Sequence, residues 1–340
     1  MSTIYEVSKL AGVSIATVSR VLNNNKVVNE KTRRNVLDVI EQLNYRPNAS
    51  AKSLASQITD SVGILVPEFH GPFYGCLMGS IEKTLRAKNK YALVASGQSS
   101  EEIEKKSIEF LISRNCDALV LHVEALSDEY LIELSKKNTP FVLINRYIEE
   151  ISHHCIYLDN EHGGYIMAKY LLEQGHRNFA YISGPLQKSD SKGRYLGVQQ
   201  ALLEYDISLN ESLFYQGNFH QECGSKAMKK FINSNVGFTA VICANDQMAI
   251  GALLVAHEKG IDIPRDVSFI GFDNSILAQY SYPELSSIDN QVENIGEMAA
   301  NWVLKYVYQE PLKDIEHILK PRLINRNSVS TLIERFIYIS

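Results

Sequence analysis

The sequence predicts an α/β protein in which a three-helix, helix-turn-helix head and a hinge helix precede a core of two doubly wound lobes. Residues 3–23 have the pattern of two short helices joined by a tight turn, and from residue 62 short apolar runs alternate with amphipathic stretches. Residues 1–60 carry 8 Lys or Arg against 5 Asp or Glu, whereas the rest of the chain carries 26 against 34. A weakly basic head on an acidic body suits a protein that places one end on nucleic-acid phosphates.

The first predicted helix begins at a capping box. Thr3 and Glu6 can each satisfy an unpaired backbone donor near the other residue. Gly12 supplies the turn that follows, because glycine adopts left-handed backbone angles without strain. The apolar residues of this helix recur at helical spacing and predict one buried face, made of Ile4, Val7, Leu10 and Ala11.

The second predicted helix has the features of a recognition helix. Ser14 caps its start, and Val18, Val21 and Leu22 face the first helix. An ordinary helical hairpin inside a larger fold is the alternative, but the rest of the first sixty residues also fits DNA binding. A recognition helix contacts base edges with its N-terminal residues. The residues facing outward here are Ile15, Ala16, Thr17, Ser19 and Arg20.

A third helix and a short linker complete the predicted head. Asn29 is the expected cap, and Pro47 ends the helix because proline restricts the residue before it. Residues 48–56 are rich in small side chains and could form two helical turns, which are marginal alone in water. This segment is either a flexible linker or a hinge helix that folds on the duplex and inserts Leu54 between base steps in the minor groove. The apolar stripe of the third helix comprises Val36, Leu37, Ile40 and Leu43.

The core is predicted from its alternating strands and helices, which are typical of parallel sheets covered on both faces. So many units favour two doubly wound lobes over one sheet, with ligands bound at the carboxyl ends of the strands. We expect strands at 62–66, 91–95, 118–123, 141–144, 155–158, 179–183, 213–216, 240–243 and 267–272, and helices at 73–89, 101–115, 127–138, 161–175, 193–206, 220–235, 245–260 and 292–308.

Composition and motifs exclude several classes of protein. A chain of 340 residues with 45% hydrophobic and 21% charged residues has ample length for a globular core, and it contains neither an 18-residue apolar run nor a secretory signal. Five scattered cysteines indicate reduced thiols in a cytoplasm. No phosphate loop or catalytic signature is present, and the Ser-x-x-Lys pattern at 189–192 lacks its Lys-Thr-Gly companion, so we expect neither an enzyme nor a cofactor. The pair His153–His154 is expected in a solvated loop and not as a metal site, because adjacent side chains point apart.

Polar and aromatic side chains at strand ends predict a sugar site. Carboxylates accept paired hydrogen bonds from neighbouring hydroxyls, while arginine and amide groups donate. Asp273 and Asn245 each follow an apolar strand, and Arg194 lies just inside a predicted helix. Asp273 and Asn245 could instead merely cap the following helix or turn.

The chain resembles the LacI/GalR family of bacterial transcription regulators. The resemblance rests on Val-Ser-x-Ala-Thr-Val-Ser-Arg-Val-Leu-Asn at 13–23, Leu-Asn-Tyr-x-Pro-Asn at 43–48 and Ser-Leu-Ala at 53–55. It implies a dimeric repressor with a minor-groove hinge helix and a two-lobed, periplasmic-binding-protein-like core that takes a sugar- or nucleoside-type effector. The implied divisions are a head at 1–47, a hinge and linker at 48–60, and a core at 61–340. Within the core, lobe 1 spans about 61–160 and 291–320, lobe 2 spans about 161–290 and 321–340, and the chain crosses near 160, 290 and 320.

The same resemblance implies two sets of functional residues. Three of the effector contacts named below have an alternative explanation. Phe73 and Tyr74 could instead belong to the apolar core of a lobe, and His122 could be a buried histidine whose hydrogen bonds are satisfied within the protein. The implied DNA contacts are Thr3, Ser14, Ile15, Ala16, Thr17, Ser19, Arg20, Asn23, Tyr45, Asn48, Ser53 and Leu54, and the implied effector contacts are Phe73, Tyr74, His122, Asn145, Arg194, Phe219, Asn245 and Asp273.

Several stretches resemble the galactose-operon repressor branch of that family, namely residues 115–122, 143–146, 189–197 and 327–331. His70-Gly-Pro-Phe-Tyr74 departs from the commoner Asp-Pro-Phe-Phe. The expectation is a cytoplasmic repressor of carbohydrate uptake or catabolism, which binds operator DNA as a homodimer without a lac-type tetramerisation helix and is released by galactose or a close hexose. A regulator that needs a phosphocarrier-protein or purine corepressor and a sugar-binding transport component are the alternatives.

Overall fold

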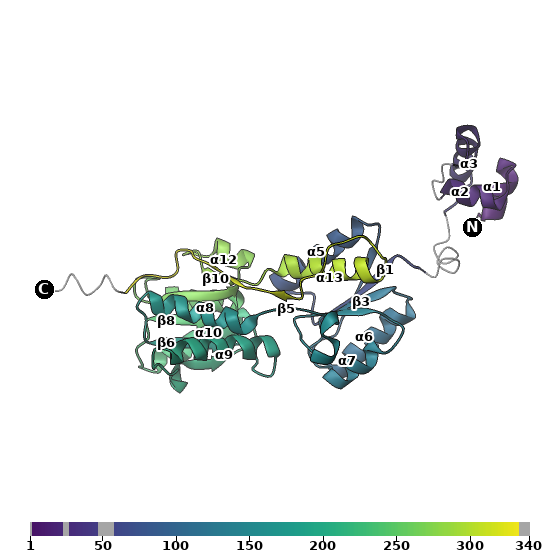
Figure 1. Cartoon of the computed structure of the whole chain (residues 1–340). Coiled ribbons are helices and arrows are strands. Elements are labelled where there is room, and N and C mark those ends of the chain that lie inside the picture. The colour runs from purple at the N-terminus through teal and green to yellow at the C-terminus, as the bar shows by residue number, and fades with distance from the viewer. Residues whose placement is uncertain (1, 23–26, 47–57, 333–340) are drawn as a thin grey trace. The chain divides into compact units, whose positions relative to one another are not determined.

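A computed structural model describes residues 2–22, 27–46 and 58–332, which form two compact units at 1–59 and 60–340 (Figure 1). Four residues with implied DNA contacts lie outside the described residues, namely Asn23, Asn48, Ser53 and Leu54.

The described residues of the first unit form three helices, and the expected caps of these helices are confirmed. They are α1 (Ile4–Ala11), α2 (Ile15–Leu22) and α3 (Glu30–Gln42). The Thr3 backbone N–H donates to the Glu6 carboxylate at 2.8 Å, and the Glu6 N–H donates to Thr3 Oγ1 at 3.3 Å. Gly12 has a left-handed φ of 64°.

The core of the head differs from the expected one at two leucines. Val7, Val18 and Val36 are fully buried at its centre. Leu10 and Leu37 were expected inside, but they are 53% and 47% exposed. Among the described residues, each helix packs against the two others, and this packing leaves the edge of its apolar stripe uncovered. Leu37 lies about 100° around the axis from Val36, and Val39 is buried in its place.

The first lobe of the second unit, here called lobe 1, is built on a six-stranded parallel sheet in the order β11-β5-β4-β3-β1-β2. The 3-10 helix η1 (Glu149–His154) precedes β5. The strands are β1 (Ser61–Val66), β2 (Tyr91–Ser96), β3 (Ala118–Leu121), β4 (Phe141–Ile144), β5 (Cys155–Leu158) and β11 (Ile318–Leu319), and the helices are α5 (Gly71–Arg86), α6 (Glu101–Ser113), α7 (Asp128–Ser135) and α13 (Val292–Tyr306).

The second lobe, lobe 2, is built on a sheet in the order β12-β10-β9-β8-β6-β7, which is parallel except for β12. Its strands are β6 (Phe179–Ser183), β7 (Phe214–Gln216), β8 (Ala240–Cys243), β9 (Ser268–Asp273), β10 (Ser286–Asp289) and β12 (Arg322–Ile324), and its helices are α8 (Asn160–Glu173), α9 (Ser189–Leu203), the 3-10 helix η2 (Glu211–Leu213), α10 (Gln221–Asn233), α11 (Asp246–Glu258) and α12 (Ile276–Tyr280).

The predicted fold class is confirmed for the helix-turn-helix head and the two-lobed core, whereas the expected hinge helix at 48–56 lies outside the described residues. The chain passes between the two sheets at three places that can be followed in Figure 1. These connections lie between β5 and α8, between β10 and α13, and between β11 and β12. The sequence analysis missed β10, β11, β12 and α12. β10 has the polar sequence Ser-Ser-Ile-Asp, and the other three span five residues or fewer, too short to show a period.

The helices α8 and α9 cross closely, and this crossing fixes the position of α9 in lobe 2. A Cβ atom on Gly164 would lie 2.0 Å from the backbone oxygen of Arg194, and one on Gly197 would lie 1.9 Å from that of Glu161. Glycine is therefore required for the two helices to approach this closely. α9 begins at Ser189, four residues earlier than expected, so Arg194 lies in its second turn. No helix among the described residues is long and apolar enough to span a bilayer.

Candidate functional site

The head presents the start of α2 on its surface. Ala16 and Arg20 are exposed, while Ile15, Thr17 and Ser19 are half-buried. Two of the other residues expected at DNA have local roles, because Thr3 caps α1 and the Ser14 hydroxyl accepts the Thr17 N–H at 3.2 Å. Tyr45 packs against the apolar core of the head.

A cavity of about 530 Å³ lies between lobe 1 and lobe 2, within the size range of small-molecule sites. Its lining includes aromatic rings, amides and carboxylates from both lobes. All eight residues expected at the effector line it, namely Phe73, Tyr74, His122, Asn145, Arg194, Phe219, Asn245 and Asp273.

The strands explain this convergence, since the carboxyl ends of parallel strands meet at one edge of a sheet. His122 directly follows β3, and Asn145 directly follows β4. In lobe 2, Asn245 comes two residues after β8, and Asp273 is the last residue of β9. Phe73 lies in the first turn of α5.

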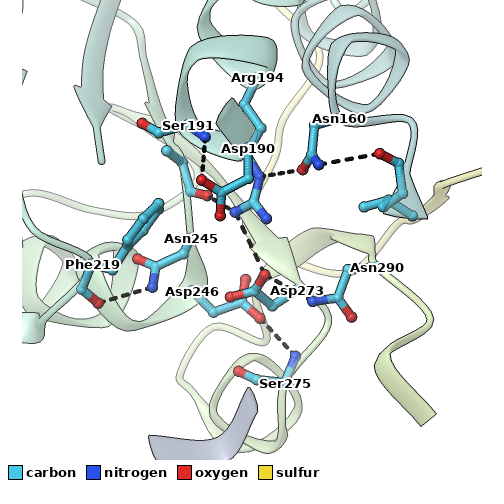
Figure 2. A network of polar contacts seen from close by, with 12 residues as sticks. Asn160, Asp190, Ser191, Arg194, Phe219, Asn245, Asp246, Asp273, Ser275 and Asn290 are labelled. Carbon is cyan, nitrogen blue, oxygen red and sulfur yellow. Dashed lines mark hydrogen bonds and ion pairs between the residues drawn. The ribbon is translucent and has the colours of Figure 1, made fainter. Parts of the chain in front are cut away.

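Arg194 is held firmly on the lobe 2 wall, as Figure 2 shows. Its Nε donates to Asn160 Oδ1 at 2.9 Å, and its Nη1 donates to the Ala244 carbonyl at 2.6 Å. The guanidinium carbon lies 3.7 Å from the centre of the Phe272 ring, and Nη1 lies 3.6 Å from Asp273 Oδ1. The charged group is thus oriented before any ligand arrives.

Asp273 is a buried carboxyl with an altered acidity. It accepts a hydrogen bond from Asn290 Nδ2 at 3.0 Å. Burial raises the pKa of Asp273 to about 7, against the opposing charge of Arg194 and with a contribution from the Asp246 carboxyl. Burial also raises the pKa of Asp246, although the Ser287 hydroxyl donates to it at 2.6 Å. The cavity wall therefore carries a carboxyl group that can change its charge near neutral pH.

Asn245 caps a helix, which is one of the two roles that the sequence left open, and it also contacts a neighbouring aromatic residue. Its Oδ1 accepts the Met248 N–H at 3.0 Å and so caps α11, and its Nδ2 donates to the Phe219 carbonyl at 2.9 Å. Phe219 has a positive φ of 73°. A Cβ atom on Gly184 would lie 2.3 Å from the Phe219 ring, so glycine is required beneath it. Asn245 thus positions the aromatic ring that lines the cavity.

The lobe 1 wall combines aromatic rings with polar atoms that have no partner. The Phe73 and Tyr74 rings pack edge to face at 5.2 Å, and the His122 ring lies 5.6 Å from Tyr74. His122 Nδ1 and Asn145 Oδ1 are buried without a hydrogen-bond partner among the described residues. Burial lowers the pKa of His122. The Nδ1 atom of His122 therefore lacks the hydrogen bond that a satisfied core histidine would make.

The sequence analysis missed further charged residues on the lining. Glu124 and Lys188 come from opposite lobes and form an ion pair at 2.8 Å, and Asp190 lies beside them. Spacing offered a signal for two of these residues: Glu124 is two residues past His122, and Asp190 lies one helical turn before Arg194. Also on the lining are Glu68, His70, Gln98, His220 and Gln247.

The defining residues of the two other motifs do not line the cavity. Ser189 and Lys192 are exposed in the first turn of α9. The expectation of a solvated pair at His153 and His154 is wrong for His154, which stacks on Phe141 at 4.9 Å and bonds to its carbonyl at 2.6 Å. Their rings lie 4.1 Å apart, because η1 turns them together. The part of the chain that the structure describes holds no group of three potential metal ligands.

Comparisons with known proteins agree with this architecture. Residues 3–48 match the family described as bacterial regulatory proteins, lacI family, and residues 168–329 match the periplasmic binding protein-like domain. The transcriptional regulator GalR of Escherichia coli K12 is 37% identical over 97% of this chain and 96% of that protein. The transcriptional repressor PurR of Proteus mirabilis is 34% identical over 97% of each.

Among solved structures, a lac repressor dimer bound to operator and the anti-inducer ONPF has a TM-score of 0.86 at 24% identity. It covers 97% of this chain and 99% of that one, and this likeness concerns the fold. The two matched domains lie in the order in which the head and the two-lobed core occur here. The chain therefore belongs to the LacI family of DNA-binding transcriptional regulators, which are not enzymes.

Proposed function

We propose that this regulator represses genes of carbohydrate uptake or catabolism, binds a two-fold operator as a homodimer in the cytoplasm, and is released by galactose or a close hexose. One observation carries the proposal: a guanidinium, carboxyls, amides and aromatic rings from both lobes line a single cavity. The similarity to GalR over nearly the whole chain supports it.

The lining matches the chemistry of a neutral sugar. An ionised Asp273 accepts hydrogen bonds from neighbouring hydroxyls, and Arg194 lies beside it to donate. His122 and Asn145 line the opposite wall, and each has one buried polar atom without a partner among the described residues. The aromatic rings of Phe73 and Phe219 can cover the apolar C–H face of a pyranose.

A ligand that bonds to both walls stabilises one arrangement of the lobes over others. In the proposed mechanism this arrangement separates the hinge segments of a dimer and so weakens their hold on the minor groove. The effect is a shift in population, and its size is limited by the difference in sugar affinity between the two states. At the head, Arg20 is exposed on α2 and would reach a base edge in the major groove.

A regulator that needs a corepressor is the second candidate, because PurR is 34% identical over 97% of the chain. Such a protein would bind DNA more tightly with its ligand, whether a purine or a phosphocarrier protein. A transport component is disfavoured, since it would have no use for the helix-turn-helix head.

Calorimetric titration of the full chain with galactose, other hexoses, adenine and hypoxanthine tests the ligand class. Gel-shift titration of a two-fold operator with and without each binding compound then gives the sign of the response. Galactose binding with weaker operator affinity supports the proposal. Purine binding with tighter operator affinity would replace it with the corepressor function.

A further inference from the structure

An ion pair joins the two lobes beside the cavity. Glu124 follows β3 in lobe 1, and Lys188 is the residue before α9 in lobe 2. The Lys188 ammonium nitrogen lies 2.8 Å from the Glu124 carboxylate oxygens. The Glu124 side chain is only 12% exposed, and the Lys188 side chain is 26% exposed. By contrast, the Arg194–Asp273 pair lies within lobe 2.

Glu124 is fixed in place by a second, fully buried carboxylate. The Glu104 side chain accepts hydrogen bonds from three consecutive backbone N–H groups, those of Glu124, Ala125 and Leu126, at 2.9 to 3.2 Å. The Ser99 hydroxyl also donates to the Glu124 carboxylate. These bonds pin the loop after β3, so the Glu124 carboxylate is held with little freedom.

Lys188 lies close to groups that line the cavity in lobe 2. Its ammonium lies 5.7 Å from the centre of the Phe219 ring. It also begins the helix that carries Arg194. Glu124 stands two residues after His122. Burial alone would raise the pKa of Glu124, but the neighbouring His122 and Lys188 side chains lower it overall. Each member of the pair is therefore linked to the ligand-facing groups of its own lobe.

We propose that Glu124 and Lys188 form an interlobe bridge that positions the two halves of the effector site before the effector binds. The pair forms only when the lobes approach, so it favours that arrangement and lowers the free-energy cost of closure that effector binding has to meet. Both are positioning residues that act through each other. The inference rests on the proposed function for its effector readout, but the bridge itself can be measured without any ligand.

A double-mutant cycle tests the pair on the full chain. Glu124→Gln and Lys188→Met should each weaken galactose binding about five- to tenfold, and the double variant should lose little more than either single variant. The charge-swapped variant, with Glu124→Lys and Lys188→Glu, should recover much of the loss. Additive losses without recovery would show two independent ligand contacts and overturn the bridge.

Interlobe distance gives a second readout, which does not depend on the identity of the effector. Spin labels replace the exposed residues Glu109 on α6 and Lys229 on α10, with exposed Cys76 changed to serine and with excess unlabelled chain present. Without ligand, Lys188→Met should lengthen and broaden the distance distribution. Lys169→Met is the matched control, because it breaks a 2.8 Å pair with Glu204 inside lobe 2 and should leave the distance unchanged. Equal distributions for wild type and Lys188→Met would overturn the bridge even if galactose binds, whereas a shift without galactose binding would refute only the proposed ligand.

Discussion

Arg194 and Asp273 form an ion pair at 3.6 Å that is too long to be a hydrogen bond, because the Arg194 Nη1 atom donates to the Ala244 carbonyl instead. The carboxyl of Asp273 therefore keeps acceptor capacity toward the cavity. The guanidinium is held by Asn160 and Phe272, so it provides a fixed positive charge next to a carboxyl that is available to a ligand.

Asp273→Ala should abolish most of the sugar response and leave operator binding intact. The loss of the carboxylate leaves sugar hydroxyls unpaired in a buried site, which costs about 1–3 kcal/mol or more. Gel shifts with increasing galactose measure the response. Asp262→Ala, which removes an exposed carboxylate of lobe 2, is the control and should respond as wild type does. Normal release of Asp273→Ala by galactose would show that the effector site is assigned wrongly.

The stability of the ligand-free protein should depend on pH through Asp273. Its pKa is raised from about 4 to about 7, so the folded state binds a proton that the unfolded state has lost. This contribution to the free energy of unfolding is full at low pH and decreases as the pH rises from about 4 to about 7. Urea unfolding across that range should show a smaller decrease in Asp273→Asn than in wild type. Asp246 titrates nearby and leaves some slope in the variant; identical slopes would contradict the assignment.

Gly197→Ala should destabilise the core, because the added Cβ would lie 1.9 Å from the Glu161 carbonyl oxygen and would push α8 away from α9. Overpacking of this kind typically costs about 1–3 kcal/mol. Thermal unfolding measures the change. Gly237→Ala serves as the control, since its Cβ would meet nothing within 4 Å, and it should unfold near the wild-type temperature.

The strand ends explain why so much of the site was predictable from the sequence. Apolar runs fix the strands, and residues at their carboxyl ends must meet at one edge of each sheet. This explains why Asp273, together with His122 and Asn145, which the family resemblance implied, shares one lining. The pair Glu124–Lys188 was not predictable, because it depends on how closely the two lobes approach. Leu10 was misplaced for a related reason: helical spacing defines an apolar stripe, but the packing partners decide how much of it is buried.

Arg20→Ala and Leu54→Ala should weaken operator binding in different ways. Arg20 is exposed on α2, and its loss should cost about 1–3 kcal/mol and relax base preference at one position of each half-site. Leu54 is the residue that we expect the hinge segment to insert between base steps in the minor groove. Its loss should therefore lower affinity without changing the bases preferred in the major groove. Binding to a library of operator variants at fixed salt separates the two effects. Wild-type operator affinity in Leu54→Ala would show that Leu54 does not insert between base steps.

Operator binding should require two heads, and sugar should oppose it. One head is a small unit with a net charge of only +3 over residues 1–60, so alone it should bind weakly and mainly through phosphates. Two heads joined by their cores gain from effective concentration and select half-sites about 34–36 Å apart or a multiple of this. The isolated head should therefore lose most operator affinity, and a covalent link between two hinge segments should restore much of it. Gel-shift titration of a two-fold operator, with the stoichiometry of the complex measured, checks both points. One protomer per operator would refute the dimer, and tighter binding with galactose would reverse the proposed role of the sugar.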